Sequence, residues 1–140
     1  MILPRACEQR QLRDRPAGYA VWQEETFGSL PDHVLEVLDP GIEWDASRRI
    51  FDPGVFHGHA GVDAFLAKLR EVWRSGRIEP LDYVAVDDAV VVPVRLHLDS
   101  RTHGQTMQAH AAHVWTVRDG RIVRWTLFQS KEDALQAARA

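Results

Sequence analysis

Carboxylates and histidines stand at positions suited to acid–base chemistry in two stretches of this sequence. The first stretch is Ile42-Glu43-Trp44-Asp45, where a carboxylate ends a short apolar run. The second covers residues 109–125 (AHAAHVWTVRDGRIVRW), with His110 and His113 ahead of Asp119-Gly120. A carboxylate can take a proton from carbon, and an imidazole can donate a hydrogen bond to the oxygen that gains charge. Whether these residues act together depends on the elements that position them.

The orientation of the two histidines follows from strand periodicity. Asp-Gly between alternating apolar runs is a strong indication of a hairpin, so we expect strands over residues 106–117 and 122–128. Counting back from the turn, Val117, Trp115 and His113 share one face, whereas His110 has the opposite parity. We therefore expect His113, and not His110, to share a face with Trp115 and Val117.

Helices are predicted ahead of these strands. Pro16 opens a helix that runs to about residue 27, and a capping box at residues 29–32 begins a short second helix with Leu38 inward. Residues 48–60 are predicted to form a loop. The clearest helix follows, with Gly76 as its C-cap and one apolar face: Val62, Phe65, Leu66, Leu69 and Trp73.

From Ile78 onward the hydrophobic period changes to two. Strands over 83–86 and 90–98 flank a turn at Asp87-Asp88, and a final short helix follows Ser130. Because Pro93 cannot donate a ladder hydrogen bond, we expect an edge position or a bulge there. Helices separated from an antiparallel sheet define the α+β class. In the strand over 90–98, Val90, Val92, Val94, Leu96 and Leu98 share one face, and Val91, Pro93, Arg95, His97 and Asp99 share the other.

Composition excludes several classes of protein. The chain has 140 residues, 45% hydrophobic and 26% charged, which is typical of one soluble globular domain; we place it at residues 16–140, after a polar arm at 1–15. A net charge of −3 lacks the basic footprint of a nucleic-acid-binding protein, and no apolar run is long enough to span a membrane. The single cysteine and the absence of a convincing signal peptide predict a cytoplasmic protein.

The order of elements, together with four motifs, resembles the nuclear-transport-factor-2-like superfamily and, within it, the SnoaL-like group. The motifs are LEVLDPGIEWD, FHGHAGVDAFLAKLREVW, AHVWTVRDGRIVRW and FQSKEDALQAA, and the resemblance runs from about Ala17 to Ala138. It implies a cone-shaped, curved antiparallel sheet wrapped around N-terminal helices and enclosing one pocket. Relatives include ketosteroid isomerase, polyketide cyclases, scytalone dehydratase and limonene epoxide hydrolase. The implied activity is cofactor-independent acid–base chemistry on a small, mostly apolar molecule.

The resemblance also implies site residues. Asp45 stands where ketosteroid isomerase has its catalytic base, and His113 falls at the position of an oxyanion-hole Asp. We therefore expect Asp45 and His113 to face one apolar cavity as a catalytic pair. The isomerase's tyrosine and the epoxide hydrolase's Arg-x-Asp are matched only loosely, by Tyr19 and by Arg95-Leu96-His97. The expected ligand-binding residues are Trp22, Trp44, Tyr19, Trp115 and His97.

Each of these assignments has a structural alternative. Asp45 would otherwise cap a turn before Ser47, His113 would be a satisfied core histidine, and the tryptophans would be core. If the face bearing Arg95 and His97 is convex, those residues are surface or dimer contacts. His57-Gly58-His59 is too weak a pattern for a metal site, so we expect neither metal nor cofactor.

Proteins that resemble this fold usually pair through the convex face of the sheet. We therefore expect a homodimer, with Val91, Pro93, Arg95 and His97 as the candidate patch. The alternative to an enzyme is a non-catalytic protein of the same fold, which binds a small ligand or acts through its dimer surface.

Overall fold

The structure is a computed structural model that describes residues 35–49, 52–101 and 105–139. The predicted N-terminal arm and first helix, with Tyr19 and Trp22, lie outside these residues. The second predicted helix was expected to carry Leu38 inward. Leu38 is buried as expected, but it is the first residue of strand β1, so its assignment to a helix is wrong.

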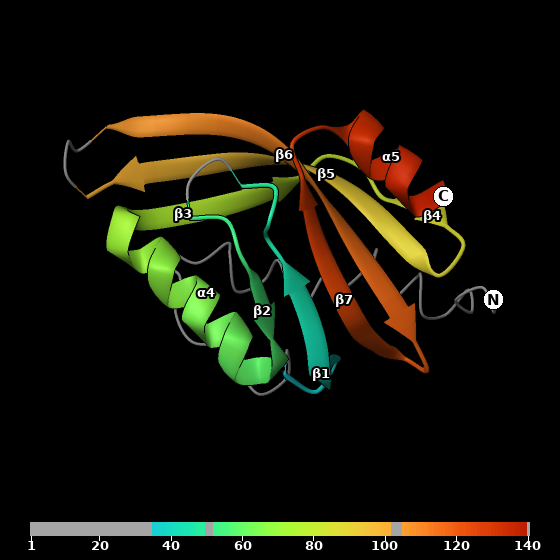
Figure 1. Ribbon diagram of the computed structural model, residues 1–140. Helices are drawn as coiled ribbons and strands as arrows, with labels where there is room; N and C mark the ends of the chain where they lie inside the picture. Colours follow the sequence, from blue (N-terminus) through green and yellow to red (C-terminus); the bar gives the residue numbers. More distant parts are fainter. Residues whose placement is uncertain (1–34, 50–51, 102–104, 140) are drawn as a thin grey trace.

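The described residues form a mixed α+β structure built on one curved, unclosed sheet (Figure 1). The strand order is β2-β1-β7-β6-β5-β3, and β4 also pairs with β5. All pairings are antiparallel except β1 with β7, which run parallel. The elements are β1 Leu38–Asp45, β2 Val55–His57, α4 Gly58–Val72, β3 Trp73–Pro80, β4 Val84–Val86, β5 Ala89–Ser100, β6 Thr106–Arg118, β7 Arg121–Phe128 and α5 Lys131–Arg139.

Each face of the sheet carries one of the two described helices (Figure 1). We call the face that packs against α4 the inner face and the face that carries α5 the outer face. The inner core includes Val62, Phe65 and Leu66 of α4. The outer core is smaller and joins Ala134 of α5 to five residues of the sheet: Ala89, Val91, Ala112, Val114 and Phe128. Neither described helix is long and apolar enough to cross a membrane.

The two tight hairpins form where the sequence predicts them. Asp119 and Gly120 have φ values of 52° and 77°, as a turn with two left-handed residues requires, and Asp87 has φ 53°. The cap at Ser130 is confirmed, because its Oγ accepts a hydrogen bond of 3.1 Å from the N–H of Asp133.

The main helix is shifted from its predicted position. It begins at Gly58, inside the stretch predicted to be a loop, and that stretch also contains β2. It ends at Val72, where Trp73 is already extended and its N–H bonds to the Leu69 carbonyl. The chain therefore passes directly from helix to strand, and Gly76 pairs with Leu98 in the sheet instead of capping the helix.

Pro93 lies inside the sheet, not at an edge. On one side β5 pairs with β6 along its length, including Pro93 with Ala112. On the other side β4 pairs only as far as Val91, and β3 pairs from Val94 onward. Pro93 thus occupies the gap between two partner strands, where the missing N–H leaves no bond unmade.

Candidate active site

Asp45 and His113 point to opposite faces of the sheet. Asp45 pairs with Thr126 across the parallel ladder, and its neighbour Trp44 pairs with Trp125. His113 pairs with Leu127, which has the same parity as Trp125. Since paired residues share a face and neighbours alternate, His113 shares the inner face with Trp44, and Asp45 lies on the outer face. The prediction that the two residues line one cavity is therefore wrong.

Asp45 is the centre of an ion and hydrogen-bond cluster on the outer face. Its Oδ1 accepts hydrogen bonds from the Ser47 N–H at 3.0 Å and the Ser47 hydroxyl at 2.5 Å. Its Oδ2 lies 3.5 Å from Arg48 and 3.7 Å from Arg124. Burial alone would raise the pKa of Asp45, but the Ser47 hydrogen bonds and the two arginine charges together hold the pKa below its ordinary value. This geometry is that of a turn cap, the alternative expected for Asp45.

His113 belongs to an aromatic cluster on the inner face, which we define as Trp44, Phe65, His113, Trp115 and Trp125. Trp44 stacks on Trp125 at 4.1 Å between centroids, and Trp115 meets Trp44 edge-on at 5.9 Å. The His113 ring lies 4.8 Å from Trp125. Trp44, Trp115 and Trp125 are each at most 3% exposed. Trp44, Trp115 and His113 thus share one buried cluster through Trp125, and the role of the two tryptophans as cavity walls stays a prediction.

Burial determines the charge of His113. The side chain is 2% exposed, and desolvation lowers its pKa from 6.5 to about 3. The imidazole is therefore neutral at physiological pH. A neutral imidazole still donates one N–H, so it can hydrogen-bond an oxygen without first binding a proton.

One arginine, Arg49, lies on the inner side of the sheet, and no sequence motif predicted it there. The Arg49 guanidinium sits 5.3 Å above the ring of Phe65, which itself lies 5.9 Å from Trp44. Desolvation lowers the pKa of Arg49, although the charge of Asp52 opposes the effect. An arginine inside a predicted loop carries no periodicity, so no pattern in the sequence indicated this placement.

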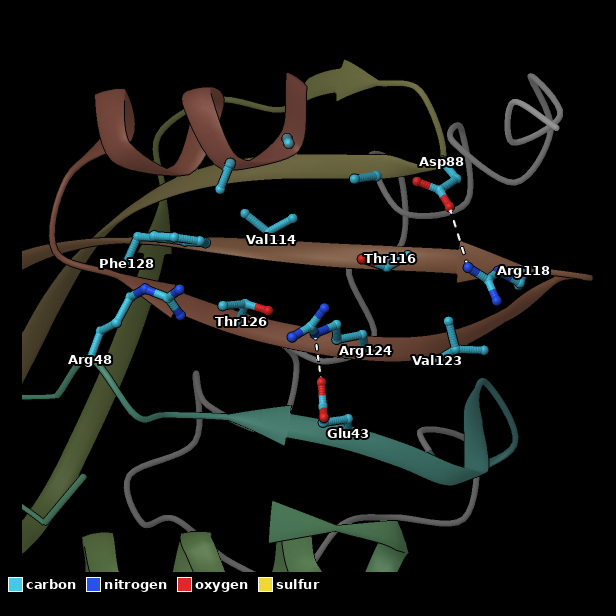
Figure 2. A pocket seen from close by; sticks show the side chains of 13 residues that line it. Glu43, Arg48, Asp88, Val114, Thr116, Arg118, Val123, Arg124, Thr126 and Phe128 are labelled. Atoms are coloured by element: carbon cyan, nitrogen blue, oxygen red, sulfur yellow. Dashed lines mark ion pairs between the residues drawn. The ribbon is translucent and has the colours of Figure 1, made fainter. Parts of the chain in front are cut away.

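The outer face is hollowed by a groove of about 510 Å³ beside the Asp45 cluster (Figure 2). Apolar side chains such as Val114 and Phe128 line it together with polar ones such as Thr116 and Thr126, and it reaches the alanines of α5. Figure 2 shows Arg124 turned toward Glu43, at 2.7 Å, and Arg118 turned toward Asp88, at 3.9 Å. The guanidinium groups of the groove are thus paired with carboxylates of the same chain.

His97 lies away from the aromatic cluster. Its Nε2 is 3.0 Å from the Glu79 carboxylate, which also faces Arg95 at 3.5 Å. The His97 hydrogen bond, aided by the Arg95 charge, lowers the pKa of Glu79. Arg95 and His97 occupy strand positions opposite in parity to Val94 and Leu96, which pack in the inner core. Of the two positions considered for His97, pocket or surface, the strand parity therefore favours the outer surface.

The candidate dimer patch also needs correction. Val91 is fully buried in the outer core, and Pro93 is buried as well. Of the four residues expected in the patch, Arg95 and His97 keep partial exposure.

The His57-Gly58-His59 motif has a structural role at the start of α4. His57 is the N-cap residue, and the His59 Nε2 lies 2.9 Å from the Leu38 carbonyl. Gly58 adopts φ 71°, a conformation that favours glycine. Within the described ranges, no group of three potential ligands is placed to hold a metal ion.

The family model for the SnoaL-like domain matches residues 17–125 of this sequence. The chain therefore belongs to the SnoaL-like domain family. Its fold is NTF2-like: an NTF2-like protein from Anabaena variabilis ATCC 29413 is 13% identical, with a TM-score of 0.71 over 93% of this chain and 95% of that one. No protein with a curated description matches the chain.

Several solved structures share this fold at low sequence identity. TerC, co-crystallised with polyporic acid, is 23% identical, with a TM-score of 0.69 over 95% of this chain and 99% of TerC. A putative SnoaL-like polyketide cyclase from Jannaschia sp. CCS1 is 18% identical, with a TM-score of 0.68 over 98% of this chain and 97% of that one. A limonene-epoxide-hydrolase-like enzyme from M. tuberculosis is 18% identical, with a TM-score of 0.64 over 96% and 92%. At these identities the likeness concerns the fold.

Proposed function

We propose that this protein is a cofactor-independent enzyme that catalyses acid–base chemistry on a small, mostly apolar molecule. The reaction class is isomerisation, cyclisation or dehydration that begins with transfer of a proton from the carbon beside a carbonyl to a water molecule. Family membership supports the class, because relatives of this fold include a putative polyketide cyclase and an epoxide hydrolase. The proposal concerns the inner face of the sheet.

The observation that carries the proposal is the neutral, buried imidazole of His113 within a cluster of tryptophans. When a proton leaves the carbon beside a carbonyl, negative charge develops on the oxygen. A fixed N–H donor in a dry, low-dielectric environment stabilises that charge more than water does. The aromatic rings would supply an apolar surface for the rest of the substrate. His113 is thus proposed as the electrophilic group of the site.

Asp45 is not part of this proposal as the base. It is the only carboxylate buried among the described residues, and it lies on the outer face, bound to Ser47. For Asp45 we propose a structural role, fixing the turn after β1.

The proposed assembly comes from the family resemblance, and the proposed location comes from the single cysteine. We propose a cytoplasmic homodimer that pairs through the outer face and uses neither cofactor nor nucleic acid. Arg95, His97 and Glu79 are the partly exposed polar residues proposed to contribute to that interface.

Hydrogen–deuterium exchange tests the enzymatic proposal without knowledge of the natural substrate. The protein would be incubated in D₂O with a panel of small cyclic and aryl ketones, and deuterium at the carbons beside the carbonyl would be measured by mass spectrometry. We expect at least one ketone to exchange faster with the protein than without it. His113→Leu should slow this exchange by about 100-fold, the typical cost of losing one oxyanion-hole donor.

The matched control is His110→Leu, on the same strand but exposed, which should exchange like the parent. If the folded parent accelerates exchange of no ketone, the enzymatic proposal is overturned in favour of a non-catalytic ligand-binding protein. Equal rates for the parent and His113→Leu would remove His113 from the site.

A further inference from the structure

Two consecutive arginines after β1 point to opposite sides of the sheet. Arg48 lies over Phe128 of the outer face, with 4.5 Å between the guanidinium carbon and the ring centroid. Arg49 lies over Phe65 of the inner core at 5.3 Å. The loop that holds them is closed by the Ala46 N–H, which bonds to the Gly54 carbonyl at 2.9 Å. The loop therefore presents one guanidinium to each side.

The bonding of the two guanidinium groups differs. Arg48 pairs with Asp45 in the outer cluster. In Arg49 the Nη1 is buried, and among the described residues it has no hydrogen-bond partner. Asp52 acts on Arg49 only through its charge, because no ion pair within 4.0 Å joins the two in the described part of the chain. A buried donor without an acceptor is costly, so native structures satisfy nearly all of them.

From this arrangement we propose that Arg49 binds the carboxylate of an apolar ligand whose body packs on the aromatic cluster. This inference rests on the proposed function, since it assigns a substrate class to the same inner face. The guanidinium offers planar, paired N–H donors that match a carboxylate, and it keeps its charge at any physiological pH. Phe65 beneath it provides a cation–π contact that holds the group in place.

The position of Arg49 relative to His113 defines the ligand further. Phe65 lies 5.8 Å from Trp125, and Trp125 lies 4.8 Å from His113. Two aromatic residues thus separate the cation from the hydrogen-bond donor. The ligand is therefore an acid whose carboxylate and reacting oxygen stand at different ends of an apolar body that spans two aromatic side chains.

Calorimetric titration with 2-naphthoate and 2-naphthamide tests the proposal on the full chain. The two probes share an aromatic body and differ in charge. We expect the parent to bind 2-naphthoate at least tenfold more tightly than 2-naphthamide. Arg49→Met, which keeps length and removes the charge, should bind the two probes equally, and Arg49→Lys should retain part of the preference.

Arg48→Met is the matched control, because it removes the neighbouring arginine from the outer face; its preference for 2-naphthoate should equal that of the parent. Equal affinity of the parent for both probes, no binding of 2-naphthoate, or a preference that survives in Arg49→Met would each overturn the proposal. The comparison of 2-naphthoate with 2-naphthamide on the parent protein needs no variant. It therefore tests the proposal even if Arg49→Met does not fold. The two proposals can fail separately. If Arg49→Met loses the preference for 2-naphthoate but the parent exchanges no ketone, the carboxylate site is upheld and only the enzymatic proposal is overturned.

Discussion

Asp45 and His113 were expected to act together, but residue alternation along β1 turns Asp45 away from the face that carries His113. Trp44 and Asp45 are neighbours on one strand, so they cannot both face the same cavity. This constraint was present in the sequence, and the family resemblance obscured it. Parity along β6 correctly placed His113 with Trp115, because the two residues stand two apart on a strand that pairs regularly with β5. Arg49 could not be anticipated, because loop residues have no periodic constraint.

The buried state of His113 makes stability sensitive to mild acid. Its pKa is about 3 in the folded protein and 6.5 as the reference value, so the unfolded chain binds a proton that the folded chain excludes. The free energy of unfolding should therefore fall as pH drops from about 6.5 toward 3. Urea denaturation at pH 7.5 and pH 5.0 measures this loss.

His113→Leu should remove most of that loss between pH 7.5 and 5.0, whereas the exposed-site variant His110→Gln should keep it. Asp45 also loses stabilisation in acid, because its pKa is lowered, but only near and below its ordinary value of 3.8. A loss of stability between pH 7.5 and 5.0 therefore comes from histidine and not from Asp45. A parent protein equally stable at both pH values would contradict the account of His113.

Replacing Asp45 should weaken the fold. Asp45→Asn loses the ionic part of its contacts with Ser47, Arg48 and Arg124, and we expect the free energy of unfolding to fall by about 1–3 kcal/mol. Glu43→Gln is the comparison: its ion pair with Arg124 is shorter, at 2.7 Å, but it is 38% exposed, so the loss should be below about 1 kcal/mol. A larger loss for Glu43→Gln in urea denaturation would refute this ranking.

At the scale of elements, strand and turn patterns were predicted well and boundaries near glycines were not. β5, β6 and β7 lie within two residues of their predicted ends, since alternation and turn chemistry act locally. The start of α4 was missed because Gly58 was taken as part of a loop, although it is the first residue of the helix. Gly76 was taken as a cap, but no turn follows the helix and β3 begins directly.

Gly58 should be intolerant of a side chain. Its φ is 71°, and an added Cβ would lie 3.1 Å from the Pro40 carbonyl oxygen. Gly58→Ala is therefore expected to lower the free energy of unfolding by about 1–2 kcal/mol. Gly54→Ala is the control, because its Cβ would make only ordinary contacts of 3.5 Å with Phe56 and should change stability by less than about 0.5 kcal/mol. Thermal denaturation of both variants compares them; equal midpoints would contradict the strain argument.

At the scale of the whole molecule, the order of elements and four sequence motifs were sufficient to identify the family. Long-range features were not accessible in the same way, because they depend on which strands pair. The gap between β3 and β4 that accommodates Pro93 is one such feature. The outer groove is another, since its lining residues come from β1, β5, β6, β7 and α5, which are far apart in the sequence.

The proposed homodimer is a property of the whole molecule and is measured directly by light scattering. The expected mass is twice the 15.9 kDa of one chain at micromolar concentration. If the interface includes Arg95 and Glu79, the charge reversal Arg95→Glu should shift the population toward monomer, because it places two carboxylates side by side. A parent mass equal to one chain would rule the dimer out.

The central claim is that chemistry belongs to the inner face around His113 and not to the outer face around Asp45. The most direct test compares kcat/KM of His113→Leu and Asp45→Asn for the ketone that the parent exchanges fastest. We predict a loss of about 100-fold for His113→Leu and less than about threefold for Asp45→Asn, when both are folded at the assay temperature. The reverse result, with Asp45→Asn inactive and His113→Leu near the parent, would contradict the account.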